Sequence, residues 1–441
     1  MGSIARRGLL CGMAGTGAML AAAPVLGAAK VGPGGFSAER LKRLTRGMQG
    51  LVDRGVTAGT VTLLYRKGAI AQVDAVGWRD LEARTPMKRD TLFRIASMSK
   101  PVTSVAVLQL VEQGKLSLEE PVDKFLPELA NRRVLNRPDG PLDDTHPAKR
   151  PITVLDLLTH RSGLVYNFTS TGPISKAMTE TMGPANGLGP DEWMKRLGTL
   201  PLAWDPGQRW TYSVSTDVLG VLVERVSGEK FRDYLGAHIW GPLGMQDTDF
   251  FAPPAKQDRL AKVYGTGEDG KPKPVPIPAG NAPPPFSSGG GGMISTADDY
   301  LKFARMMLQA GASVDEKGGD HRILSRKWLR LMTSNWLSAE QRREQFFGRD
   351  FWGGMGFGLG VSVVDDIARQ AAVGYGSKGS FGWPGAFGTW WQADPVEDMI
   401  LIFMIQTAPN LGAGQSDRVV QQAGPSPLAT FQNLAYDAIE S

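Results

Sequence analysis

Residues 59–76 read GTVTLLYRKGAIAQVDAV. Two runs rich in β-branched residues, Gly59–Tyr65 and Ala69–Val76, flank the turn-like Arg66-Lys67-Gly68, and this pattern predicts an antiparallel hairpin. Strand-like runs return only near the C-terminus, at Phe357–Val364, Ala386–Gln392 and Met399–Gln406. Strands at both ends of a chain, with helices between them, predict one sheet that the two ends build together.

The section between these strands is predicted to be helical. A helix is expected from Ser97 to Val111, with Gly114 closing it. From there to about residue 285 the sequence shows no convincing strand pair, only further helical segments: Val154–Leu158, Asp217–Val226 and Phe231–Ile239. We therefore predict an α/β fold of the α+β type, in which helices flank an antiparallel sheet (about 36–110 and 290–441). An all-α part (about 111–289) packs beside it, with a cleft between the two.

A loop and a helix start mark the return from the helical section to the strands. The Pro/Gly-rich segment 268–292 ends in four glycines, and loops of such length often border a site or are mobile. Ser295-x-x-Asp298 matches the capping-box pattern. It predicts a helix that begins there and ends before Gly311.

Composition is that of an ordinary globular protein. The chain has 441 residues, 42% of them hydrophobic and 21% charged, which excludes fibrous, collagen-like and wholly disordered chains. The formal net charge of +5 is small and dispersed, so no nucleic-acid partner is expected. Cys11 is the sole cysteine and lies in a predicted leader, so the mature chain would have no disulfide and no cysteine-ligated metal. We expect no metal and no cofactor.

The first 29 residues have the features of an export signal. Arg6 and Arg7 precede the uncharged run Leu9–Ala29, which ends in small residues that suit a signal peptidase. We predict a signal peptide over 1–29 and a periplasmic mature chain, with a loose match to the twin-arginine route. A membrane anchor and a disordered tail are the alternatives. Pro24 and the glycines make the run a poor spanning helix, so no stable membrane span is expected.

Several common catalytic signatures are missing from the sequence. It has no G-x-S-x-G elbow, no H-E-x-x-H zinc helix, no C-x-x-C pair and no G-x-x-x-x-G-K-[ST] phosphate loop. Two G-x-G-x-x-G matches, 265–270 and 374–379, lack the strand-turn-helix context that dinucleotide binding needs. The four histidines are scattered; their spacing leaves a Ser-His-Asp triad open, but nothing supports one.

The positive signal is Ser97-x-x-Lys100. Residues i and i+3 at a helix start share a face, so the Lys100 amine would lie beside the Ser97 hydroxyl and, when neutral, could take its proton. The spacing alone is weak evidence, because Ser227-x-x-Lys230 also matches at the end of a predicted helix. The competing interpretation of Ser97 is a helix cap followed by a solvated lysine.

Two further features fit the same chemistry. Tyr212 lies in a loop before the helix expected at Asp217, and a tyrosine hydroxyl can relay protons; alone, it would be read as a half-buried aromatic residue. In segment 382–388, glycines surround Trp383-Pro384. They predict an edge strand whose backbone N–H groups can approach an oxyanion, with a bulge or turn as the alternative.

In combination, these motifs resemble those of a known superfamily. Three elements, in this order, are similar to the motifs of the serine β-lactamases and penicillin-binding proteins: Ser97-x-x-Lys100, Tyr212-Ser213-Val214 and Trp383-Pro384-Gly385. The resemblance covers about residues 36–408. It is to the class C β-lactamase-like branch and, within it, to the family VIII carboxylesterases.

The resemblance implies roles for particular residues. Ser97 would be the acylated nucleophile, Lys100 the base and proton shuttle, and Tyr212 the partner that activates Ser97 or the deacylating water. Which of Lys100 and Tyr212 is the principal base is left open. The backbone N–H groups of Ser97 and Ala386 would form the oxyanion hole, and His160 would be structural.

Two departures from the class C pattern bear on the substrate. Val214 stands where those enzymes carry asparagine, and Trp383-Pro384 stands where they carry Lys-Thr. A substrate site lined by Val214, Trp383 and Gly385 is apolar. A substrate carboxylate that enters it loses its hydration without gaining a charge partner, and this costs binding free energy. We therefore expect a serine hydrolase (a carboxylesterase) that cleaves small uncharged esters. The alternatives are a β-lactamase, a D-amino-acid peptidase, an acyltransferase, or a penicillin-recognising protein without turnover. The partner would be a small-molecule ester or amide; the acyl and alcohol groups and the oligomeric state are left open.

Overall fold

The computed structural model describes residues 32–182, 187–267, 270–277, 280–314, 320–343, 352–369, 376–408 and 426–440. The predicted leader, with Arg6, Arg7 and Cys11, lies outside the described residues, as does the start of the second G-x-G-x-x-G match. All helices and strands named below belong to the unit that begins at Val31.

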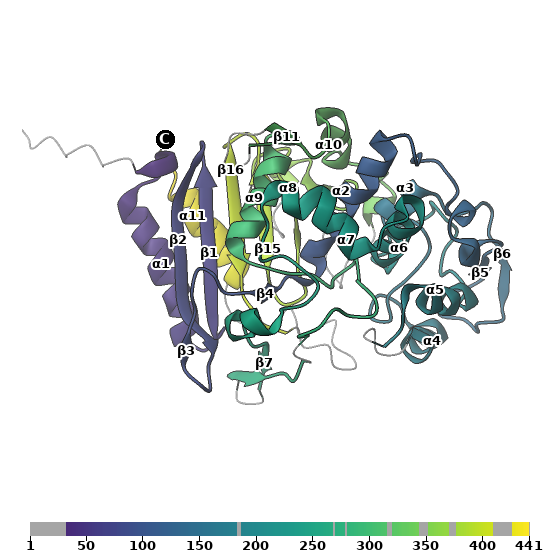
Figure 1. Ribbon diagram of the computed structural model, residues 1–441, viewed down its shortest axis with the longest axis horizontal. Coiled ribbons are helices and arrows are strands. Elements are labelled where there is room, and N and C mark those ends of the chain that lie inside the picture. The colour runs from purple at the N-terminus through teal and green to yellow at the C-terminus, as the bar shows by residue number, and fades with distance from the viewer. Residues whose placement is uncertain are drawn as a thin grey trace, which may run out of the picture. The chain divides into compact units, whose positions relative to one another are not determined.

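An eight-stranded antiparallel sheet joins the two ends of this unit (Figure 1). Strand β1 pairs with β2 on one side and with β16 on the other, with Val61 opposite Ala75 and Met404, so both ends of the chain build one sheet, as predicted. Across the sheet the strands are β12 (Met355–Phe357), β13 (Ser362–Val364), β14 (Phe381–Pro384), β15 (Trp390–Asp394), β16 (Met399–Met404), β1 (Gly59–Arg66), β2 (Ala69–Asp80) and β3 (Thr85–Pro86).

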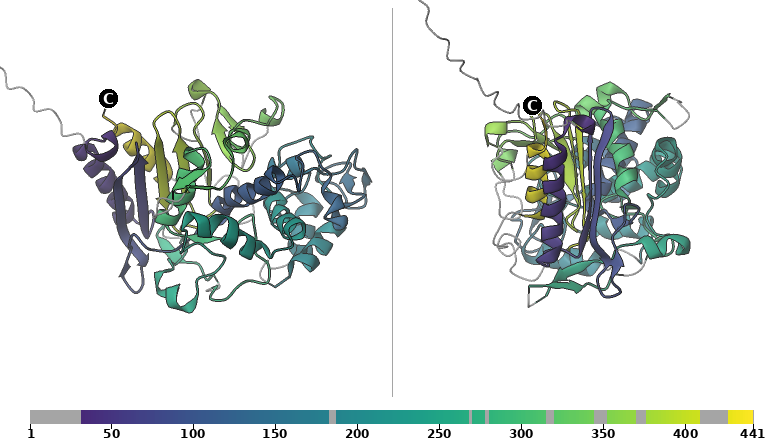
Figure 2. Two further views of the ribbon diagram at one scale, coloured as in Figure 1. Left: turned by 45° about the horizontal axis from the view of Figure 1, so that its top comes forward. Right: turned by 90° about the vertical axis from the view of Figure 1, so that its left-hand side faces the viewer.

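Helices cover both faces of the sheet. Strand β16 is buried along its whole length. Because side chains alternate between faces, Leu401 and Phe403 join one hydrophobic cluster while Ile400 and Ile402 join another. Helices α1 (Ala38–Asp53) and α11 (Pro427–Asp437) lie side by side on the first face (Figure 2). Helix α9 (Ala297–Leu308) packs on the second face.

Helix α2 (Ser99–Glu112) runs from the sheet side into the helical section (Figure 1). Its residues from Ser99 to Val111 are all buried, including the polar side chains of Lys100, Thr103 and Gln109. The helices after it are α3 (Val154–Leu158), α4 (Gly172–Met182), α5 (Pro190–Thr199), α6 (Ser215–Ser227), α7 (Phe231–Leu235), α8 (Gly241–Leu243) and, beyond α9, α10 (Arg326–Met332).

The prediction of no strand pair in the middle section was wrong. Two short hairpins occur there: β5 (Arg133–Leu135) with β6 (Thr145–Pro147), and β7 (Tyr264–Thr266) with β8 (Pro272–Pro274). Runs of three residues are too short to show an alternating pattern. The first G-x-G-x-x-G match begins in β7 rather than before a helix. The remaining small pairs are β4 (Phe93–Arg94) with β9 (Ile294–Ser295) and β10 (Ala312–Val314) with β11 (Asp320–Arg322).

Three predicted boundaries need correction. The run Phe357–Val364 is two strands, because Gly360, with φ +91°, turns the chain between β12 and β13. The strand expected from Ala386 begins only at Trp390, because Gly388 N–H donates to the Gly385 carbonyl in a turn. The cap of α9 is Thr296, whose hydroxyl accepts from Asp299 N–H, one residue later than predicted.

The prediction that Trp383 lies on an edge strand was also wrong. Strand β14 lies between β13 and β15. Its pairing with β13 involves only Phe381 and Gly382, however, so Trp383 and Pro384 extend past that neighbour. A locally unpaired strand end therefore remains next to the turn that leads into β15. The division into an α/β part and an all-α part stays a prediction.

Candidate active site

Ser97 lies in a tight turn that leads directly into α2. The turn is a 3-10 segment, Ala96–Met98, and Ala96 has φ +45°, a conformation that costs free energy in a residue other than glycine. The surrounding structure holds it, because Ile95 N–H donates to the Met293 carbonyl at 3.0 Å and the Tyr300 hydroxyl donates to the Met98 carbonyl at 2.8 Å. The Ser97 side chain is thereby presented, partly exposed, at the start of the helix.

Lys100 is buried beside this serine. Only 1% of its surface is exposed, and its Nζ lies 3.3 Å from Ser97 Oγ and 3.3 Å from the Tyr166 hydroxyl, and 2.5 Å from the Gly290 carbonyl oxygen. The amine also lies 4.5 Å from the centre of the Tyr212 ring. The alternative of a helix cap followed by a solvated lysine is therefore wrong.

The second S-x-x-K match has the structure of a surface pair. Lys230 is exposed and its Nζ forms a 2.8 Å ion pair with Glu224. Ser227 is the last residue of α6, and its hydroxyl accepts from Glu229 N–H at 3.1 Å. The positions predicted for the two matches are therefore confirmed: Ser97 lies at the entry to a helix and Ser227 at the end of one.

Tyr212 completes a three-residue cluster around the Ser97 oxygen. Its hydroxyl donates to Ser97 Oγ at 2.6 Å and lies 3.4 Å from the indole nitrogen of Trp383. The loop that carries Tyr212 is fixed, because its carbonyl accepts from the Thr169 hydroxyl at 2.7 Å. The structure thus brings together residues from α2, from the loop before α6 and from β14.

His160 contacts this loop rather than the serine. Its Nδ1 accepts from Ser213 N–H at 3.3 Å, and its ring packs 4.9 Å from that of Tyr212. Burial holds the pKa of His160 well below its usual value. The imidazole is therefore neutral at ordinary pH and acts as packing for the Tyr212 loop.

Trp383 and Val214 occupy different surroundings. Trp383 belongs to a buried aromatic cluster with Tyr212, Trp210 and Phe357, and its ring centre lies 5.1 Å from that of Phe357. Val214 packs into the main hydrophobic core. Both side chains are apolar neighbours of the Tyr212 loop, but contact with a substrate stays a prediction.

Gly385 and Ala386 lie in the turn after β14, which packs against the segment before Ser97. The Thr389 hydroxyl donates to the Ile95 carbonyl at 3.3 Å, and a Cβ atom on Gly385 would collide with that same carbonyl. Glycine is therefore required for this close approach. Ala386 follows Gly385 and is exposed. Its role in an oxyanion hole stays a prediction.

Three residues that lie on the other side of Lys100 were not identified from the sequence: Tyr166, Asp217 and Gly290. The Tyr166 hydroxyl donates to Asp217 at 3.1 Å, and the same carboxylate accepts from Gly290 N–H at 3.0 Å. Loss of hydration, together with the Asp217 charge, raises the pKa of Tyr166 well above its usual value. One indication of this region was present in the sequence: the segment 268–292, which ends in four glycines including Gly290, was expected to be a loop that borders a site or is mobile.

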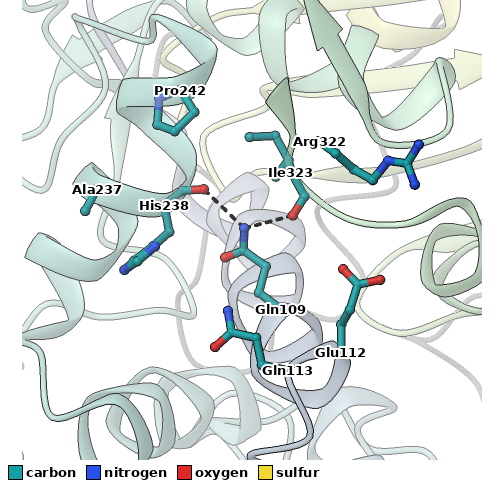
Figure 3. A pocket seen from close by; sticks show the side chains of 8 residues that line it. All are labelled: Gln109, Glu112, Gln113, Ala237, His238, Pro242, Arg322 and Ile323. Atoms are coloured by element: carbon teal, nitrogen blue, oxygen red, sulfur yellow. Dashed lines mark hydrogen bonds between the residues drawn. The ribbon is translucent and has the colours of Figure 1, made fainter. Parts of the chain in front are cut away.

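A separate hollow lies at the other end of α2 (Figure 3). It has a volume of about 390 Å³ and includes Gln109, whose amide donates to the carbonyls of His238 and Ile323 at 3.1 and 2.9 Å. At 1.5 Å per helical residue, it begins roughly 14 Å along α2 from Lys100. The hollow therefore does not belong to the cluster around Ser97.

Within the described ranges, no helix is both long and apolar enough to cross a bilayer. The same ranges contain no group of three or more His, Cys, Asp or Glu side chains that could hold a metal ion.

Comparison with known proteins establishes the family. The model of the Beta-lactamase family matches residues 44–424, so the chain belongs to the beta-lactamase family. It is 45% identical over 382 residues to Protein Rv1367c of Mycobacterium tuberculosis (strain ATCC 25618 / H37Rv), covering 86% of this chain and 93% of that protein.

An esterase and a hydrolase of solved structure are also similar. Esterase EstB of Burkholderia gladioli is 30% identical over 411 residues, which is 86% of this chain and 95% of EstB. The solved structure of EstCE1, described as a hydrolase with promiscuous acyltransferase activity, superposes with a TM-score of 0.72 at 26% identity, covering 90% of this chain and 98% of that one. The family and these relatives support hydrolase or acyl-transfer activity in general, on the β-lactamase and penicillin-binding protein fold that the sequence resemblance predicted.

Proposed function

We propose that the protein is a serine carboxylesterase that hydrolyses small uncharged esters through an acyl-enzyme at Ser97. The observation that carries the proposal is the position of Ser97 Oγ, 2.6 Å from the Tyr212 hydroxyl and 3.3 Å from Lys100 Nζ. A nucleophile within hydrogen-bond reach of its base is the arrangement that activates a serine.

The reaction follows from this arrangement. Ser97 Oγ attacks the ester carbonyl while its proton passes to the neutral Lys100 amine, directly or through Tyr212. The N–H groups of Ser97 and Ala386 stabilise the oxyanion. Collapse breaks the bond to the alcohol, which leaves with the stored proton. Water then attacks the acyl-enzyme, gives a proton to the same base and releases the acid, while Ser97 regains its hydrogen.

The surroundings of Ser97 favour apolar substrates. The Trp383 indole takes the place of a cationic side chain and is itself buried within an aromatic cluster. Phe168 is 45% exposed, although it stacks on Tyr166 with ring centres 4.8 Å apart. An exposed aromatic ring next to the cluster can cover the apolar group of an ester, whereas an anionic β-lactam would lose hydration without gaining a charge partner from Trp383.

The test compares p-nitrophenyl acetate and butyrate with a cephalosporin, using the wild type and Ser97→Ala. We expect ester hydrolysis that exceeds cephalosporin hydrolysis and that falls to the background rate in Ser97→Ala. Equal ester rates for the two proteins would discard the proposal. Faster cephalosporin turnover would make the protein a β-lactamase, and a stable adduct at Ser97, seen by intact mass, would indicate a penicillin-recognising protein.

Acyl transfer is the second candidate. The similar protein EstCE1 is described as having promiscuous acyltransferase activity, and the same acyl-enzyme gives a new ester when an alcohol replaces water. Adding a primary alcohol to the ester assay separates the two reactions. A new ester that grows at the expense of the free acid would indicate transfer.

A further inference from the structure

Asp217 is a buried carboxylate that does not touch Ser97, Lys100 or Tyr212 through any hydrogen bond found in the described residues. It is the third residue of α6 and 6% exposed, at a helix N-terminus that favours negative charge. Three donors converge on it: the Tyr166 hydroxyl at 3.1 Å, Gly290 N–H at 3.0 Å and the Ser288 hydroxyl. Both oxygens of the Asp217 carboxylate therefore accept hydrogen bonds from groups of the protein itself.

Two of these donors also contact Lys100. The Tyr166 oxygen and the Gly290 carbonyl lie 3.3 and 2.5 Å from Lys100 Nζ. The approach is close, since a Cβ atom on Gly290 would collide with Asp217 and with the Tyr166 oxygen. Asp217 therefore holds both groups that, together with Ser97, surround the amine.

The direction of each hydrogen bond then follows. Tyr166 has one hydroxyl hydrogen, and a carboxylate can only accept, so that hydrogen points to Asp217 and the Tyr166 oxygen can only accept from Lys100. The Gly290 carbonyl can likewise only accept. A neutral amine has two hydrogens and one lone pair. With both hydrogens given to Tyr166 and Gly290, the lone pair of Lys100 is left facing Ser97.

We propose that Asp217 is a positioning residue that orients the Lys100 lone pair toward Ser97, acting through Tyr166 and Gly290. This inference rests on the proposed function and deepens it. The raised pKa of Tyr166 agrees with the geometry, because the tyrosine keeps its hydrogen over the pH range of an assay. In other pairs of a nucleophile and a base, a third group orients the base; Asp217 would be that third group here.

Asparagine at position 217 provides a sharp test. Its oxygen would keep the bonds from Gly290 and Ser288, so its NH2 group would face Tyr166 and donate to it. The Tyr166 hydrogen would then turn toward the Lys100 lone pair and compete with Ser97. We expect Asp217→Asn to lower kcat/KM for p-nitrophenyl butyrate about tenfold to a hundredfold. Tyr166→Phe in the Asp217→Asn background should restore kcat/KM to the level of Tyr166→Phe alone.

The matched control is Asp299→Asn. Asp299 is also the third residue of its helix, α9, and is 3% exposed, but it accepts from Asp247 N–H and the Thr248 hydroxyl. We expect Asp299→Asn to lower the melting temperature without changing kcat/KM in the folded fraction. A folded Asp217→Asn with wild-type kcat/KM, or a double variant worse than both single variants, would overturn the inference. If Asp217→Asn does not fold, wild-type kcat/KM in Tyr166→Phe overturns it.

A fluorophosphonate probe separates this inference from the proposed function. Ser97 Oγ bonds to phosphorus as fluoride leaves, and Lys100 takes the serine proton, so the labelling rate reports activation of the serine without any ester. If the wild type is labelled but hydrolyses no ester, the proposed function fails. The labelling rates of the same variants then decide the role of Asp217. A wild type that is not labelled would overturn both.

Discussion

Replacing Tyr212 by phenylalanine removes one oxygen atom and leaves the ring in place. That oxygen donates to Ser97 Oγ at 2.6 Å, and the ring remains held by its stacking on Trp210, with ring centres 6.1 Å apart. The substitution therefore deletes a proton donor next to the nucleophile with little change in packing.

The expected loss combines two effects. When Ser97 develops negative charge, the bond from Tyr212 is charge-assisted and worth about 1.5–3 kcal/mol. Loss of a proton relay costs about a hundredfold to ten-thousandfold in rate. We expect kcat/KM for p-nitrophenyl butyrate to fall at least about a hundredfold, which corresponds to about 2.7 kcal/mol of transition-state stabilisation. Unfolding free energy should fall by only about 1 kcal/mol.

The assay pairs Tyr212→Phe with Tyr264→Phe, measuring kcat/KM and urea unfolding for both. Tyr264 is also buried, and its hydroxyl is bonded to Leu81 N–H at 2.7 Å and to Glu82 at 3.1 Å, away from the Ser97 cluster. The control should lose comparable stability and keep its activity. A folded Tyr212→Phe that retains more than about a third of the wild-type kcat/KM would refute the role of the hydroxyl.

Two further expectations concern the substrate and acid stability. Phe168→Ala should raise KM for p-nitrophenyl butyrate several-fold and should raise KM for p-nitrophenyl acetate less. The control Ile367→Ala, also at an exposed apolar residue, should change neither KM. Equal KM values in the wild type and both variants would contradict an apolar contact between Phe168 and the substrate. Hydrogen bonding to Arg259 lowers the pKa of Asp247 to about 2, so this pair stabilises the fold above the unfolded-state pKa near 3.9 and loses that effect as pH falls toward 2. After solvent screening the contribution is about 1 kcal/mol, and Asp247→Asn should narrow the stability difference between pH 6 and pH 2.5 by that amount in urea titrations.

Strong local patterns predicted the sheet and several of the central helices, whereas α4 and α5 were not predicted. The hairpin and the segment Val154–Leu158 were found because each combines a clear hydrophobic pattern with its own turn or cap. Strand β2 nevertheless continues to Asp80, beyond the predicted end at Val76. The β5–β6 hairpin was missed, because its three-residue strands are stabilised by tertiary contacts. One such contact is the bond from Leu135 N–H to the Leu202 carbonyl at 2.9 Å.

In the candidate site, too, residues in local motifs were found from the sequence and residues joined only by tertiary contacts were not. Ser97, Lys100 and Tyr212 belong to motifs with readable spacing and do converge in space. Asp217 and Tyr166 have no such signature. Tyr166 reaches Lys100 from a loop 66 residues further along the chain, and Asp217 is connected to Lys100 only through Tyr166 and through Gly290 of the glycine loop. The sequence therefore indicated the groups that lie next to the Ser97 oxygen, but not Tyr166 and Asp217, which lie behind Lys100.

The pairing of β1 with β16 has a consequence for biosynthesis. The hydrogen-bonding edge of β1 stays uncovered until residues 399–404 have left the ribosome, and the β14 strand that carries Trp383 is also made late. A nascent or prematurely terminated chain therefore contains Ser97 and Lys100 but lacks the strand that carries Trp383. We expect such a chain to be inactive and to expose an aggregation-prone strand edge at β1. Completion of the last strand and the gain of activity should coincide during synthesis.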